Sequence, residues 1–192
     1  MKKKLYIITN ESIFIDPNKN YFCDNIDFKT IPEELNNYFD VNIIGRKSIK
    51  ERSKKINLKN IYLFKNIFFY LIEIFKNLKN NDNKYLIISL SPYTLLASIL
   101  LKMYSKKTFL YLRSDGYKEY KSIFGFFGPS IYHLMFKIGV FKSNLIVCRK
   151  HLLKEKNGSV VSPSQLNDKW FKDIKSINTA KTKLLYVGRL RV

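Results

Sequence analysis

Four adjacent residues follow a strand-like segment and have side chains suited to ligand chemistry. The run LYLRSDGYKEY, residues 110–120, places Arg113, Ser114, Asp115 and Gly116 where an apolar segment gives way to a helical pattern. The planar guanidinium of an arginine can bind an acidic group, and an aspartate can accept a hydrogen bond from a hydroxyl. Ser114 and Asp115 are also good helix N-caps. The sequence therefore leaves a catalytic role and a capping role open for Asp115.

Asn10 follows another strand-like segment, LYIIT at residues 5–9. If the two strands are parallel, their carboxyl ends meet at one edge of the sheet, where ligands of α/β proteins bind. Asn10 and the adjacent Glu11 would then line the same cleft as Arg113. A plain turn after the strand is the alternative.

A glycine and an arginine follow a third strand-like segment, in KLLYVGRLRV at residues 183–192. Gly188 leaves its backbone amide accessible, and Arg189 carries a permanent positive charge. Together they could hold a diphosphate as negative charge develops on it. An ordinary turn with a solvated arginine is the alternative.

The elements that must position these residues form an alternating pattern. Runs that are apolar at nearly every position predict strands at residues 5–9, 41–45, 85–91, 108–114, 143–148 and 158–162. Longer stretches between them predict helices at residues 32–39, 59–80, 93–106 (starting near Pro92) and 117–142. Strands covered on both faces and joined by helices are typical of a parallel sheet. The sequence thus predicts a Rossmann-like α/β fold with helices on both faces.

The order of these segments suggests more than one domain. We expect residues 1–165 to form the first domain, 166–182 a polar linker, and 183–192 the first strand of a second domain.

The segments near the end of the sequence resemble a known enzyme family. Gly188, Arg189 and Leu190 after a strand, preceded by the polar stretch SPSQLNDKWF at 162–171, are similar to the retaining, group 1 (family 4) glycosyltransferases of the GT-B fold. In that family the second domain opens with a strand and Gly-Arg-Leu, followed by Glu-Lys-Gly. The resemblance implies that the chain is the acceptor-side domain plus the first strand of a truncated nucleotide-sugar-binding domain, and that this fragment alone is inactive.

The resemblance also implies a function. Such enzymes transfer a sugar from a nucleotide-sugar donor to a glycan or lipid-linked acceptor in cell-envelope polysaccharide biosynthesis, with retention of configuration and without a metal or cofactor. Gly188 and Arg189 match the donor-diphosphate site, and Asp115 best matches the acidic or histidine residue of the cleft. The remaining candidates for the acceptor side of the cleft are Asn10, Arg113, Ser114 and Gly116. The family's glycines after the first strand have no counterpart in residues 9–22.

The net charge of +20 bears on partners and location. Only six of the 35 basic residues are arginines, the residue that nucleic-acid sites favour, so no nucleic-acid partner is expected. Aromatic and basic residues interleave in segment 117–142, a composition suited to an anionic membrane surface. Segment 59–80 is apolar over more than one helix face and needs a second covering surface, either a neighbouring helix, which we favour, or the lipid interface. We therefore expect a cytoplasmic protein with a peripheral place on the inner face of the cytoplasmic membrane. The alternative is a non-enzymatic, basic Rossmann-like domain that binds anionic membrane or nucleic acid.

Overall fold

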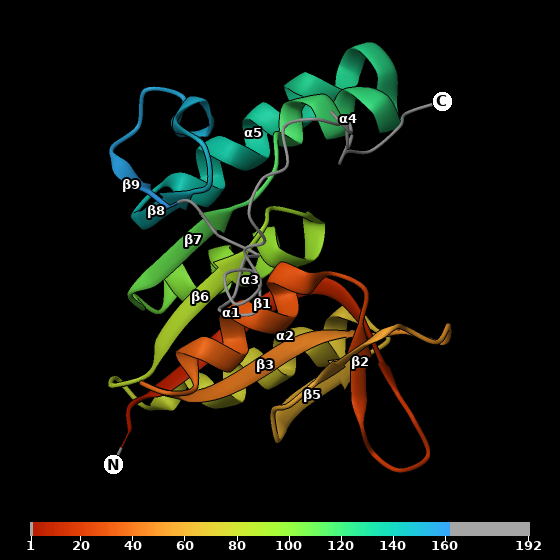
Figure 1. The fold of residues 1–192 in the computed structure, drawn as a ribbon. Helices are drawn as coiled ribbons and strands as arrows, with labels where there is room; N and C mark the ends of the chain where they lie inside the picture. The colour runs from red at the N-terminus through yellow and green to blue at the C-terminus, as the bar shows by residue number, and fades with distance from the viewer. Residues whose placement is uncertain (1, 162–192) are drawn as a thin grey trace, which may run out of the picture.

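The computed structural model describes residues 2–161. These residues form a mixed α/β fold around a mostly parallel sheet (Figure 1). The parallel strands lie in the order β5-β3-β1-β6-β7-β8-β9, with bounds β1 Lys4–Ile15, β3 Asp40–Lys47, β5 Asn60–Phe64, β6 Lys84–Ile88, β7 Thr108–Leu112, β8 Ser143–Val147 and β9 Gly158–Val160. The predicted Rossmann-like α/β class is confirmed.

Strand β1 is longer than the predicted 5–9 and changes partners along its length. Its first part pairs with β3 and β6, and the pairing with β6 ends at Thr9. The register with β3 shifts between Ile8 and Ser12, and the last residues of β1 pair antiparallel with β2 (Tyr21–Cys23), which in turn pairs with β4 (Lys54–Ile56). Residues 9–11 thus form an irregular stretch inside a strand instead of a loop after one.

Helices are distributed unequally over the two faces of the sheet (Figure 1). One apolar cluster joins the sheet to helices α2 (Ile67–Lys76), α3 (Pro92–Met103), α4 (Gly116–Phe124) and α5 (Gly128–Val140). The cluster on the other face includes residues of one described helix, α1 (Ile26–Leu35). Helix α1 begins earlier than the predicted 32–39 because Asn25 caps it, accepting from the backbone amides of Asp27 and Phe28.

The prediction of one helix over residues 59–80 was wrong. Asn60–Phe64 is strand β5, which pairs with β3, and α2 begins only after Asn66, whose side chain accepts from the Phe68 amide at 2.7 Å. The segment is apolar at most positions, so its periodicity does not separate a strand from a helix. The tertiary pairing with β3 decides between them.

The predicted helix at 117–142 folds back on itself. Helices α4 and α5 are joined by the 3-10 turn Gly125–Phe127, where Gly125 has a left-handed φ of 58°. A Cβ on Gly128 would lie 2.0 Å from the Tyr120 carbonyl oxygen, and a Cβ on Gly116 would lie 2.1 Å from the Tyr132 ring, so glycine allows the two helices to pack closely. We call this unit the α4–α5 hairpin.

Residues Gly116–Val140 are together long and apolar enough to cross a membrane by length and composition. The arms of the α4–α5 hairpin have 9 and 13 residues, which corresponds to about 14 and 20 Å of helix. A bilayer core is about 30 Å thick. In this conformation neither arm spans it.

The strand predicted at 41–45 is longer, Asp40–Lys47. The other predicted strands end slightly early, at Ile88, Leu112, Val147 and Val160. This leaves residues 89–91 and 113–115 as connections at the carboxyl edge of the sheet. The predicted domain boundary at 165, the linker 166–182 and the strand 183–192 lie outside the described residues.

Candidate functional site

A pocket of about 500 Å³ opens beside the irregular stretch of β1 and the carboxyl ends of β6 and β7. Its polar lining includes Asn10, Glu11, Ser89, Ser91 and Arg113. Its apolar lining comes from the α4–α5 hairpin and includes Ile123, Phe124, Ile131 and Met135. We call it the edge pocket. It suits a ligand with one polar and one apolar part.

Arg113 and Glu11 form the charged centre of the edge pocket. Arg113 Nη2 lies 3.6 Å from Glu11 Oε2, and the two side chains are 17% and 22% exposed. Arg113 Nε and Nη1 are buried and have no hydrogen-bond partner among the described residues. Buried donors without acceptors are costly. Arg113 therefore carries two donors that no described residue satisfies, and its permanent positive charge lies in the lining of the edge pocket.

The ionisation of Glu11 is perturbed by the same surroundings. Burial raises the pKa of the Glu11 carboxyl above its ordinary value, and the positive charge of Arg113 opposes this rise without cancelling it. Burial therefore destabilises the charged form of the Glu11 carboxyl more than the ion pair with Arg113 stabilises it. Glu11 is a carboxyl group that holds its proton to higher pH than a solvated glutamate.

Ser89 has an unusual backbone at the rim of the edge pocket. Its φ is 62°, in the left-handed region, although it is not glycine. Its amide donates to the Tyr111 carbonyl at 2.8 Å, and its own carbonyl accepts from Thr94 Oγ1 at 2.9 Å. Such conformations persist where surrounding contacts enforce them, and they cluster at functional sites.

Asp115 is the N-cap of α4. Its Oδ1 accepts from the Tyr117 amide at 3.1 Å, and its carbonyl accepts from the amides of Lys118 and Glu119. Asp115 does not line the edge pocket, whereas Glu119 does. The capping role anticipated from the sequence is confirmed, and its catalytic role stays a prediction.

The other predicted residues lie around the same sheet edge. Asn10 lines the edge pocket and its Oδ1 accepts from Arg46 Nη1 at 3.4 Å. Ser114 and Gly116 line, with Arg113, a smaller hollow of about 10 Å³. Gly188 and Arg189 lie outside the described residues.

Sequence reasoning missed Ser89, Glu119 and the apolar wall of the edge pocket as site residues. The sequence held one partial signal, the two serines in Ser89–Leu90–Ser91–Pro92 directly after a buried strand. A serine N-cap followed by a proline at the first helical position marks the start of a helix, here at the carboxyl edge of the sheet. The hairpin wall had no comparable signal, because it depends on how α5 folds back.

An exposed aromatic tip adjoins the edge pocket at the turn of the α4–α5 hairpin. We define the tip as Ile123, Phe124, Phe126 and Phe127, of which Phe126 is 88% and Phe127 is 70% exposed. Ile123 and Phe124 also line the edge pocket, so the tip and the pocket are continuous. The exposed lysines of the hairpin and the residues after it are Lys118, Lys121, Lys137 and Lys142.

No protein-family model, curated protein or solved structure matches the chain. Among residues 2–161, no group of three or more His, Cys, Asp or Glu side chains is placed to hold a metal ion. The inference of function therefore depends on the geometry of the edge pocket, the aromatic tip and the resemblance given above.

Proposed function

We propose that this chain carries the acceptor-binding domain of a retaining glycosyltransferase of the GT-B kind. The enzyme would move a sugar from a nucleotide sugar to a glycan or lipid-linked acceptor during assembly of a cell-envelope polysaccharide. The observation that supports this most is the edge pocket: a largely buried arginine beside a wall of apolar side chains, at the edge of a parallel sheet where ligands of α/β proteins bind.

Arg113 suggests the chemistry of the acceptor. The permanent positive charge of Arg113, in the lining of the edge pocket, would attract a carboxylate or phosphate on the acceptor. The apolar wall formed by Ile123, Phe124 and Ile131 would contact an attached lipid. An acidic sugar or phosphate carried on a hydrophobic tail satisfies both halves of the edge pocket.

In a retaining transfer, the acceptor oxygen bonds to the sugar carbon on the face from which the diphosphate leaves. The carbon–oxygen bond to the diphosphate breaks, and the acceptor's hydroxyl proton passes to the departing diphosphate. Asp115 would accept a hydrogen bond from this hydroxyl and so orient it before transfer. By the family resemblance, Gly188 and Arg189 would stabilise the charge on the diphosphate, and no metal or cofactor would be required.

The aromatic tip supports a peripheral place on the inner face of the cytoplasmic membrane. Phenylalanines at the tip would enter the headgroup region while the lysines of the hairpin meet anionic lipid. The mouth of the edge pocket would then face the bilayer, from which a lipid-linked acceptor could enter directly.

A matched pair of detergents tests the acceptor side. Octyl glucuronide and octyl glucoside share tail and ring but differ in the carboxylate, and both are used below micelle formation. A hydrogen bond to a charged group contributes about 1.5 kcal/mol or more, so the glucuronide should bind roughly tenfold more tightly by calorimetry. Arg113→Gln should remove this preference. The control Arg149→Gln, an exposed arginine after β8, should keep it.

The non-enzymatic alternative is favoured by one observation, the aromatic tip, which would serve a membrane-binding domain equally well. Such a domain has no need to distinguish the two detergents. Equal affinity for both, with unchanged affinity in Arg113→Gln, would contradict the acceptor-site proposal.

A further inference from the structure

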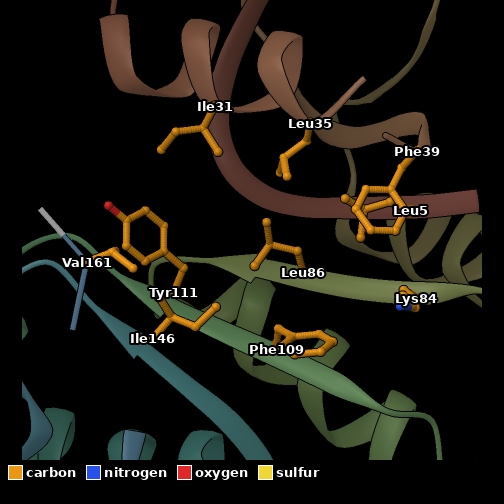
Figure 2. Close-up of a pocket in the computed structure, with 10 residues that line it drawn as sticks. All are labelled: Leu5, Ile31, Leu35, Phe39, Lys84, Leu86, Phe109, Tyr111, Ile146 and Val161. Carbon is orange, nitrogen blue, oxygen red and sulfur yellow. The ribbon is translucent and has the colours of Figure 1, made fainter. Parts of the chain in front are cut away.

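A second cavity lies on the opposite side of the molecule's sheet from helices α2 to α5. This groove of about 470 Å³ runs between α1 and the face of β6, β7 and β8. Figure 2 shows Ile31 and Leu35 of α1 pointing towards the strands, where Leu86 and Tyr111 form part of the floor. The full lining is Leu5, Ile31, Leu35, Phe39, Lys84, Leu86, Phe109, Tyr111, Ile146 and Val161. We call it the α1 groove.

The α1 groove exists because one face of the parallel sheet is only partly covered. Side chains alternate along each strand, so Tyr85 and Ile87 of β6 meet the helices of one face while Leu86 points to the other. Parallel sheets are normally covered on both faces. Among the described residues, α1 is the one helix on this face, and it leaves the floor near Phe109 and Ile146 partly exposed.

The chemistry of the lining argues against a small polar ligand. Binding sites for such molecules combine apolar walls with a few placed polar groups. The α1 groove is lined by apolar side chains except for Lys84 and the Tyr111 hydroxyl. Its lining is that of a helix-packing surface.

The chain itself supplies a segment that fits. Val161, the last described residue, is part of the groove lining, so the following residues start at the groove without a spacer. Ser162, Pro163 and Gln165 match a helix start, with a capping serine, proline at the first helical position and glutamine at the third. This pattern predicts a helix from residue 163.

The same segment carries an apolar stripe at helical spacing. Leu166, Trp170, Ile174 and Ile177 recur at intervals of four, four and three residues, which places them within about 80° on a helix. The residues between them are largely charged or polar. A helix over 163–177 would be about 22 Å long, the length of several turns along the groove.

We propose that residues 163–177 of this chain form an amphipathic helix that packs its apolar stripe into the α1 groove and completes the second face of the sheet. It is an alternative to the linker predicted for 166–182, which lies outside the described residues. The proposal does not depend on the glycosyltransferase function. The other occupant considered for the groove, a second copy of the chain, is an outcome of the test below.

Trp170 is the one tryptophan in the chain, so its fluorescence reports directly on this segment. In the full chain, a docked Trp170 should emit at shorter wavelength than a solvated tryptophan and be several-fold less accessible to acrylamide. Phe109→Ser on the groove floor should shift the emission to longer wavelength and raise quenching several-fold. Phe75→Ser, a control on α2 at the other face, should change neither.

If Phe109→Ser does not fold, a second pair of variants tests the proposal with substitutions in residues 163–177 themselves. Ile174→Ser lies in the apolar stripe and should expose Trp170, whereas Lys175→Ser lies away from the stripe and should not. The proposal is overturned if Trp170 is quenched like a free tryptophan in the full chain, or if Ile174→Ser leaves its protection intact. Protection that disappears on dilution, with a halving of the mass in sedimentation, would assign the groove to a second copy instead.

Discussion

Replacing both phenylalanines of the aromatic tip should weaken binding to anionic vesicles strongly. Phe126 and Phe127 are 88% and 70% exposed, so most of their surface is available to lipid. Full burial of a phenylalanine contributes about 1.5–3 kcal/mol. Taking the exposed share of both rings gives roughly 3 kcal/mol, or about 100-fold in the partition coefficient of the double variant Phe126→Ser, Phe127→Ser.

The assay is co-sedimentation with vesicles of anionic or neutral lipid at low and high salt. The wild-type chain should bind anionic vesicles at low salt and be released as salt screens the hairpin lysines, each contributing about 1 kcal/mol near the surface. A matched control removes two exposed apolar side chains elsewhere, Tyr38→Ser with Ile49→Ser, which are 75% and 84% exposed and lie after α1 and β3. This control should bind like the wild type.

Two results would refute a membrane-binding role of the aromatic tip: an unchanged partition coefficient in the tip variant, or an equal loss in the control variant. Equal binding of the wild type to neutral and anionic vesicles would instead refute the contribution of the lysines.

Three further predictions concern the α4–α5 hairpin and the edge pocket. Gly128→Ala should lower the free energy of unfolding in urea by about 2–3 kcal/mol, since its Cβ would meet the Tyr120 carbonyl, whereas Lys121→Ala should change it by less than about 0.5 kcal/mol; equal effects would contradict the hairpin. The raised pKa of Glu11 means that the folded state binds its proton more tightly than the unfolded state, so wild-type stability falls as pH rises above the ordinary glutamate range. The melting temperature of Glu11→Gln relative to wild type should therefore increase between pH 4 and 7, and a constant difference would contradict this. Asp115→Asn keeps a capping oxygen, so stability should change by only a few tenths of a kcal/mol while turnover of the active enzyme falls; an unaltered rate would leave Asp115 as a helix cap.

The sequence predicted the fold class because its signal is local. Strands such as 84–88 and 108–112 are apolar at nearly every position, which indicates burial on both faces in a parallel sheet. The placement of Asn10 and Arg113 at one edge followed from the parallel order of these strands. Both residues line the edge pocket in the structure.

The features that the sequence did not predict depend on contacts between distant residues. Segment 60–64 is a strand because it pairs with β3, which its own apolar pattern does not reveal. The reversal between α4 and α5 depends on Gly128 meeting the Tyr120 backbone. Glu11 faces Arg113 because β1 shifts register after Ile8, and no pattern within residues 5–15 indicates where that shift occurs.

Glycosyl transfer is tested most directly by an activity assay on the protein purified from the cells that naturally produce it. The purified protein is incubated with anionic vesicles, a lipid-linked acidic saccharide and a panel of labelled nucleotide sugars, and the anomeric configuration of the product is read by NMR. We predict consumption of one nucleotide sugar, a product with retained configuration, and a large loss of transfer in Arg113→Gln and Arg189→Gln. No consumption of any nucleotide sugar, or a product of inverted configuration, would contradict the account.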